Sequence, residues 1–157
     1  MADIKDPENT LLLDLEHGQV TIELRPDLAP NPGALIGDVA RECFYDGNAV
    51  PRVSEGFMAQ GGDPTGTGMS GSGKNLDAEF SAEPHVRGTC SMARAQDPNS
   101  ADSQFFIVFD DARFLDNQYT VWGQVIDGMD HVDKIKRGEP VQDPDKIVKM
   151  QVAADAA

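Results

Sequence analysis

The sequence is short of several features that would identify common classes of protein. It has no apolar run near the roughly 20 residues that a membrane-spanning helix needs, and only 13 lysines and arginines stand against 27 aspartates and glutamates. The resulting formal charge of −14 repels phosphates and anionic lipid, so we expect neither nucleic acid nor membrane as a partner. Two cysteines and three histidines, with no C-x-x-C spacing, are too few to predict a zinc site or another metal site.

The length and the opening residues favour one domain inside the cell. With 157 residues and no internal repeat, the chain fits a single domain over 1–157, with a core at about 10–153 and short tails. The opening MADIKDPENT lacks the basic flank and the apolar run of a secretory signal. We therefore expect a cytoplasmic protein that acts as a monomer, with Cys43 and Cys90 as free thiols.

Short apolar runs separated by turn residues predict a mainly β protein. Residues 33–43, where Ala34, Leu35 and Val39 recur at helical spacing, and residues 129–137 are predicted to form helices. Many short strands with two helices favour a closed or nearly closed antiparallel β-structure plugged by helices. The expected strands are 11–15, 19–24, 50–53, 57–60, 89–93, 104–109, 120–125 and 147–152.

Residues 68–75, GMSGSGKN, match the spacing of a phosphate-binding P-loop up to its last position. That motif ends in Ser or Thr, whose hydroxyl binds Mg²⁺, and Asn75 stands there instead. A P-loop also needs an apolar strand before it and a helix after it, whereas GGDPTGTG precedes this stretch and NLDAEFSAEP continues from it. Nucleotide binding is therefore disfavoured, and residues 61–73 are interpreted as a long surface loop.

Two other clusters carry a more specific pattern. They are PRVSEGFMAQGGDPTGTG at 51–68 and SMARAQDPNSADSQFFIVFDD at 91–111, and RFLDNQYTVWGQV follows at 113–125. Together they resemble the cyclophilin family of peptidyl-prolyl cis-trans isomerases (rotamases), over close to the full length. GFMAQGGDPTGTG and SQFFIV are specific as a pair, whereas either alone would be weak. The resemblance implies an eight-stranded antiparallel β-barrel capped by two helices, and an isomerase that needs no metal or cofactor.

The reaction that this resemblance implies is rotation about an X–Pro peptide bond. Amide resonance sets a barrier of roughly 18–20 kcal/mol, so the uncatalysed rotation takes tens to hundreds of seconds. An apolar slot for the proline ring, with a donor to the prolyl nitrogen, stabilises the transition state more than the ground state. The expected partners are proline-containing peptides and unfolded or flexible protein chains, whose folding the isomerase assists.

Alternation along the strands predicts which side chains share a face. The expected pairs are Val50 with Arg52, Met58 with Gln60 and Gln104 with Phe106, while Phe105 and Ile107 are left for the core. By resemblance, Arg52 is the catalytic residue. The resemblance also implies a proline pocket lined by Phe57, Met58, Phe106 and Leu115. It implies that Gln60 steadies the arginine or the substrate, and that the peptide is contacted by Ala93, Arg94 (through its backbone) and Gln104. Phe114 and Tyr119 match positions at the rim of the pocket.

Each of these residues also has an ordinary structural interpretation. Taken alone, Arg52 would be a solvated charge, the glutamines polar strand positions and the apolar site residues part of a core. The resemblance at both clusters favours the pocket over that interpretation. The three histidines keep the ordinary one: His17 in a turn, His85 in a loop and His131 on a helix surface.

The chain departs from the family pattern at a few positions. Val50-Pro51 stand where the family usually has Phe-His, and Phe114 and Tyr119 stand where many members carry Trp and His. These changes leave open an alternative of another class, a cyclophilin-fold binding module or chaperone that docks proline segments with little turnover. The retention of Arg52 beside the apolar pocket residues favours the enzyme.

Overall fold

The computed structural model describes residues 7–41, 45–50, 52–54, 56–62, 79, 83–93, 104–116, 119–135, 137–138 and 145–156. At positions 32, 33, 114 and 156 it describes the backbone alone. The loop at 68–75, together with Cys43, Pro51 and Arg94, therefore lies outside the described residues.

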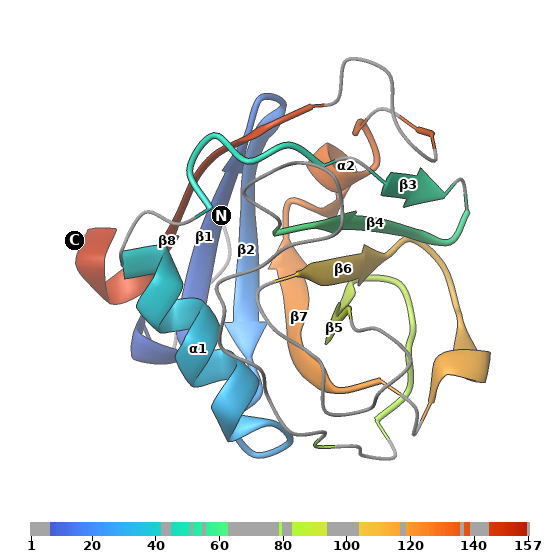
Figure 1. The fold of residues 1–157 in the computed structure, drawn as a ribbon, viewed down its shortest axis with the longest axis horizontal. Helices are drawn as coiled ribbons and strands as arrows, with labels where there is room; N and C mark the ends of the chain where they lie inside the picture. Colours follow the sequence, from blue (N-terminus) through green and yellow to red (C-terminus); the bar gives the residue numbers. More distant parts are fainter. Residues whose placement is uncertain are drawn as a thin grey trace.

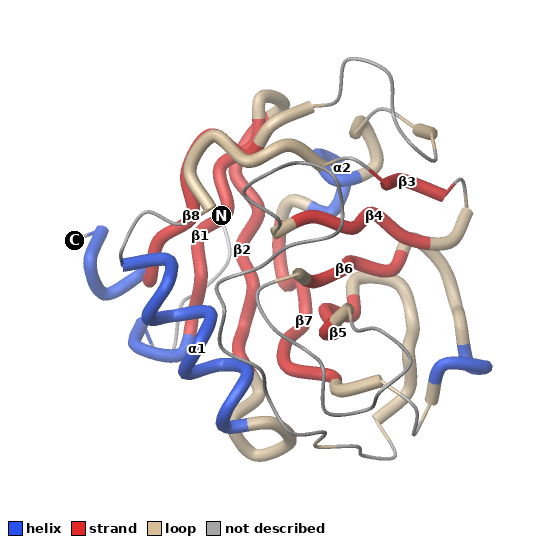
Figure 2. The backbone as a smooth tube through the Cα atoms, viewed as in Figure 1, coloured by secondary structure: helices blue, strands red, loops and turns tan. Residues whose placement is uncertain are grey.

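Eight antiparallel strands form one curled sheet, which confirms the expected mainly β fold (Figure 1). Their order across the sheet is β3-β4-β6-β5-β7-β2-β1-β8. Figure 2 shows the strands gathered in the middle of the molecule, with α1 along one side. The strands are β1 (Thr10–Leu15), β2 (Gly18–Leu24), β3 (Arg52–Ser54), β4 (Met58–Gly61), β5 (Thr89–Met92), β6 (Phe105–Val108), β7 (Val121–Asp127) and β8 (Ile147–Val152).

The two ends of the sheet, β3 and β8, meet through the backbone rather than through a long ladder. Ala49, just before β3, forms an antiparallel bridge with Lys146, just before β8. The Val50 N–H donates to the carbonyl of Asp145 at 2.8 Å, and the Ile147 N–H donates to the carbonyl of Asn48 at 2.7 Å. The curled sheet is thus closed at this corner by a short stretch of paired backbone.

Both predicted helices are present, with shifted bounds. The first, α1 (Pro30–Arg41), begins three residues before the predicted start at 33. Pro30 and Pro32 fit in its first turn, because the N–H groups there have no helical partner. Its buried side chains are Leu35, Ile36, Val39 and Ala40, whereas Ala34 is exposed.

The second helix, α2 (Met129–Val132), is shorter than the predicted 129–137, and it continues as turns to Ile135. It packs against β2. Gly128 precedes it in the left-handed region, with φ of 83°. The described residues also form three short 3-10 helices: η1 (Pro7–Asn9), η2 (Arg113–Leu115) and η3 (Ala153–Ala156).

The main core fills the inside of the curled sheet. Phe105 lies at its centre, with its ring edge-on to Tyr45 at 5.5 Å and to Trp122 at 5.8 Å between centroids. Cys90 is buried in this core as a free thiol, as predicted. Ile107 joins the same cluster, so the predicted inward face of β6 is confirmed.

The outward face of the sheet carries a second apolar cluster. On β6 it takes Phe106 and Val108, the residues that alternate with the two core positions. The alternation expected before β3 is wrong, because Val50 lies in the main core with Val53 while Arg52 is exposed. β3 begins only at Arg52, so Val50 precedes the regular strand. This outer cluster is the base of the site.

Candidate active site

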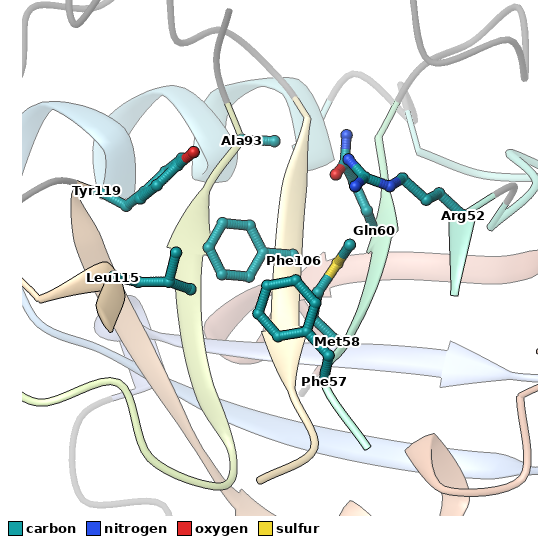
Figure 3. A pocket seen from close by; sticks show the side chains of 8 residues that line it. All are labelled: Arg52, Phe57, Met58, Gln60, Ala93, Phe106, Leu115 and Tyr119. Carbon is teal, nitrogen blue, oxygen red and sulfur yellow. The ribbon is translucent and has the colours of Figure 1, made fainter. Parts of the chain in front are cut away.

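A cavity of about 130 Å³ opens over the outer cluster. It is bounded by strands on one side and by connecting segments on the other, so its walls come from regions far apart in the sequence (Figure 3). The residues that line it are Arg52, Phe57, Met58, Gln60, Ala93, Phe106, Leu115 and Tyr119. The structure therefore brings together eight of the predicted site residues, while their roles in binding and catalysis stay predictions.

The strand register explains why three of these side chains form one row. Arg52 on β3 lies opposite Gln60 on β4, and Gln60 lies opposite Phe106 on β6. Side chains directly opposite each other in antiparallel strands point to the same face of the sheet. Met58 stands two residues from Gln60 and faces the same cavity, as the alternation predicts.

The base and one wall of the cavity are apolar. The solvent-exposed fractions of Met58, Phe106 and Leu115 are only 3%, 4% and 7%. Tyr119 meets Phe106 edge-on, with ring centroids 5.8 Å apart. Phe57 is half-buried at the rim, where its carbonyl accepts a hydrogen bond from the Phe109 N–H at 2.8 Å.

The opposite wall of the cavity is polar. Gln60 Nε2 donates to Gln104 Oε1 at 3.0 Å, which links β4 to the residue before β6. In Figure 3 the guanidinium of Arg52 extends toward the amide of Gln60 and lies over the edge of the cavity. On the far side of β3, Val53 and Gly138 exchange two backbone hydrogen bonds of 2.8 Å. The strand that carries Arg52 is thus held along both edges.

Below the cavity lies a polar group that sequence reasoning missed. His85 belongs to a loop, as predicted, but its side chain is completely buried and its ring stacks on Phe106. Its nitrogens lie 3.1 Å from Asp116 Oδ1 and 3.0 Å from Ser91 Oγ. Nothing around a lone histidine in a loop distinguishes it in the sequence, because its partners stand 6 and 31 residues away.

Burial and charge act in opposite directions on these two titratable groups. Burial lowers the pKa of His85 below its ordinary value of 6.5, although Asp116 beside it works the other way. Burial alone would raise the pKa of Asp116, but hydrogen bonds from Arg113 and from the backbone and ring of His85 outweigh it and leave that pKa below 3.8. The pair is therefore a neutral imidazole beside a carboxylate at neutral pH.

Three further site residues were predicted, and only Gln104 among them has a described side chain. Gln104 is not part of the lining, but its side chain accepts a hydrogen bond from Gln60, which is. Phe114 belongs to η2, next to Leu115, and only its backbone is described. Arg94 follows Ala93 and lies outside the described residues.

The family profile of cyclophilin type peptidyl-prolyl cis-trans isomerase/CLD matches residues 10–152 of the chain. The chain belongs to this family. A probable peptidyl-prolyl cis-trans isomerase of Brucella suis is 52% identical to it over 172 aligned positions, which cover 98% of this chain and 87% of that protein. Peptidyl-prolyl cis-trans isomerase B of Bacillus subtilis is 37% identical, over 82% of this chain and 92% of its own.

The solved structures agree with the sequence relatives. The crystal structure of a cyclophilin from Hirschia baltica matches with a TM-score of 0.89 and 32% identity, over 97% of this chain and 76% of its own. A Cryptosporidium parvum cyclophilin crystallised in the presence of the dipeptide Ala-Pro matches with a TM-score of 0.84 and 27% identity, over 91% of this chain and 98% of its own. This chain is thus a cyclophilin-type peptidyl-prolyl cis-trans isomerase in fold and function.

Proposed function

We propose that Arg52 and the apolar cavity beside it catalyse rotation about X–Pro bonds in proline-containing segments of unfolded or flexible polypeptides. The observation that carries the proposal is the row formed by Arg52, Gln60 and Phe106, which sets a permanent positive charge at the edge of an apolar cavity. The proline ring would occupy the space above Met58, Phe106 and Leu115.

Arg52 supplies the donor that the rotation needs. As the amide twists, the prolyl nitrogen loses conjugation and gains a lone pair, which accepts a hydrogen bond from the guanidinium. Because this bond is stronger in the twisted state than in the planar one, it lowers the barrier rather than only tightening binding. One hydrogen bond to a charged group contributes about 1.5–3 kcal/mol, out of about 5.4 kcal/mol for a 10⁴-fold acceleration.

The remaining stabilisation comes from the surroundings of the reacting bond. Apolar walls exclude water, and a hydrogen bond is stronger in such surroundings than in solvent. Gln60, held by Gln104, orients the guanidinium or the substrate. Ala93, just after β5, would contact the peptide, and we assign the same role to the backbone of Arg94 and a rim position to Phe114.

A protease-coupled assay of a short X–Pro peptide tests the proposal. Arg52→Ala should lower kcat/KM about 100-fold without unfolding the protein, because Arg52 is exposed. Arg41→Ala is the matched control, since Arg41 is an exposed arginine on α1 that pairs with Glu8 and Asp155. Equal acceleration by wild type and Arg52→Ala would show that Arg52 is misassigned. If neither accelerates the reaction, the chain is a binding module with little turnover.

We also propose that the protein acts as a monomer in the cytoplasm. The free thiol of Cys90 fits a reducing compartment, and none of the helices in the described ranges is long and apolar enough to cross a membrane. Sedimentation velocity tests the oligomeric state, and a dimer at micromolar concentration would contradict that part. Fractionation of cells, with detection by antibody, tests the location.

A further inference from the structure

One buried histidine lies behind three of the residues that line the proposed prolyl cavity. The side chain of His85 has no exposed surface, although it belongs to the loop before β5. These lining residues are Phe106 on β6, at the base, Leu115 on η2 and Tyr119 just before β7. His85 contacts each of them directly or through one neighbouring residue, and the isomerisation as described above does not use it.

The ring of His85 supports the base of the cavity. It stacks on Phe106 with centroids 6.2 Å apart and ring planes inclined by 20°. Tyr119 meets the ring of Phe106 edge-on from another side. A tilt of Phe106 would therefore displace one of these two rings, so the orientation of the base depends on His85 staying in place.

His85 also fixes the turn that carries Leu115. Its ring Nδ1 lies 3.1 Å from Asp116 Oδ1, and its backbone N–H donates to the same oxygen at 2.8 Å. Its carbonyl accepts from the Ala112 N–H at 2.8 Å, and the Leu115 N–H donates to the carbonyl of Ala112 at 2.9 Å. The contacts of one residue therefore hold η2 on both sides of Leu115.

The other ring nitrogen of His85 reaches the segment that carries Tyr119. Nε2 lies 3.0 Å from Ser91 Oγ, which lies 2.8 Å from the carbonyl oxygen of Thr120. A carboxylate only accepts hydrogen bonds, so the Asp116 side assigns the single proton of the neutral imidazole to Nδ1. The single proton of the Ser91 hydroxyl is donated to the Thr120 carbonyl at 2.8 Å, and Nε2, 3.0 Å from the same Oγ, is its second acceptor. The ring therefore has a polar partner at each nitrogen, which restricts its rotation.

We propose that His85 is a positioning residue that holds Phe106, Leu115 and Tyr119 in the arrangement that binds the proline ring. This inference rests on the proposed assignment of the cavity as the prolyl site. Its physical basis is pre-organisation: a ring anchored at both nitrogens keeps the apolar walls at a fixed spacing before the substrate arrives. A displacement of about 1 Å at a reacting site can cost as much as 10²-fold in rate.

The test compares His85→Phe with Met150→Ala. His85→Phe keeps an aromatic ring behind Phe106 and removes both side-chain hydrogen bonds. Met150→Ala truncates a fully buried side chain of the main core, away from the cavity, and controls for general destabilisation. At a temperature where circular dichroism shows each variant to be folded, we expect kcat/KM of His85→Phe to fall about tenfold and that of Met150→Ala to equal wild type. Equal values for wild type and His85→Phe, or equal losses in the two variants, would overturn the proposal.

A second readout keeps the proposal testable whatever the assay shows. The methyl resonances of Leu115 and the ring resonances of Tyr119 should shift or broaden in His85→Phe and stay unchanged in Met150→Ala. Unchanged resonances in His85→Phe would overturn the positioning role even if wild type shows no acceleration, a result that separately refutes the proposed function. If His85→Phe does not fold, His85→Asn, which keeps a donor toward Asp116 and removes the ring, takes its place with the same expected outcomes.

Discussion

Arg52 lies directly opposite Gln60 in the ladder between β3 and β4. β3 has only three residues, and such a short strand by itself would leave the direction of a long arginine side chain undetermined. Its pairing with β4 on one edge and with Gly138 on the other fixes the backbone from which Arg52 extends. The position of the guanidinium over the cavity is thus a consequence of backbone pairing on both edges of β3.

Gln60 and Gln104, which share a hydrogen bond, are expected to contribute to catalysis as a coupled pair. Gln60→Ala should lower kcat/KM about tenfold, because a neutral hydrogen bond is worth about 0.5–1.5 kcal/mol. Gln104→Ala should cost less, and the double variant should cost no more than Gln60→Ala alone. A double-mutant cycle on kcat/KM measures the coupling, and strictly additive losses would show that the two glutamines act independently.

Substitutions at the adjacent Phe105 and Phe106 should have separable effects, the first on stability and the second on kcat/KM. Phe105 packs against Tyr45 and Trp122 in the main core, so Phe105→Ala should lower the free energy of unfolding by about 3–5 kcal/mol. Phe106 faces the cavity, so Phe106→Ala should lower kcat/KM about 10²-fold and destabilise less. Urea unfolding and the isomerase assay, corrected for the folded fraction, separate the two. Equal losses of kcat/KM would contradict the assignment of Phe106 to the site.

The stability of the protein should fall as the pH drops below 6.5. Burial depresses the pKa of His85 below its ordinary value of 6.5. Between the folded and unfolded pKa values the unfolded chain binds more protons, so the free energy of unfolding decreases on acidification, by at most about 1.4 kcal/mol per pH unit for one group.

Urea unfolding at constant ionic strength between pH 7.5 and 5.5 measures this dependence. His85→Phe removes the titrating group and should give a shallower curve over the same range. If the two proteins have curves of the same slope, His85 is not the group responsible.

The thiol of Cys90 should resist modification in the folded protein. Its side chain is fully buried, and burial raises the pKa of the thiol above its ordinary value, so little thiolate is present at neutral pH. With an aromatic disulfide reagent, followed by peptide mapping, Cys90 should react only after denaturant is added. Labelling of Cys90 in native protein at a rate faster than global unfolding would contradict this.

Features set by local pattern were predictable from the sequence. The alternation along β6 places Phe105 and Phe106 on opposite faces, and both placements follow from the local sequence of the strand. The predicted start of α1 at residue 33 is too late, because Pro30 and Pro32 both fit a first helical turn. The predicted pairing of Val50 with Arg52 on one face is wrong because β3 begins only at Arg52.

Features set by long-range contact were not predictable in this way. His85 carries no local signal, and its role depends on Asp116 and Ser91, which only the fold brings to its two nitrogens. The closing corner at Ala49 and Lys146 likewise joins residues that are distant in the sequence. The site residues were predictable from the family resemblance, whereas the hydrogen bonds of His85 beneath them are visible only in the structure.

The pairing of Ala49 with Lys146 has a consequence for association of the sheet with other extended polypeptide chains. An unfolded chain readily adds itself as an extra strand to an open sheet edge. Here Ile147 on one outer strand is bonded to Asn48, and Val53 on the other is bonded to Gly138. At these points the backbone groups that could pair with another extended chain are already occupied, so strand addition is blocked there.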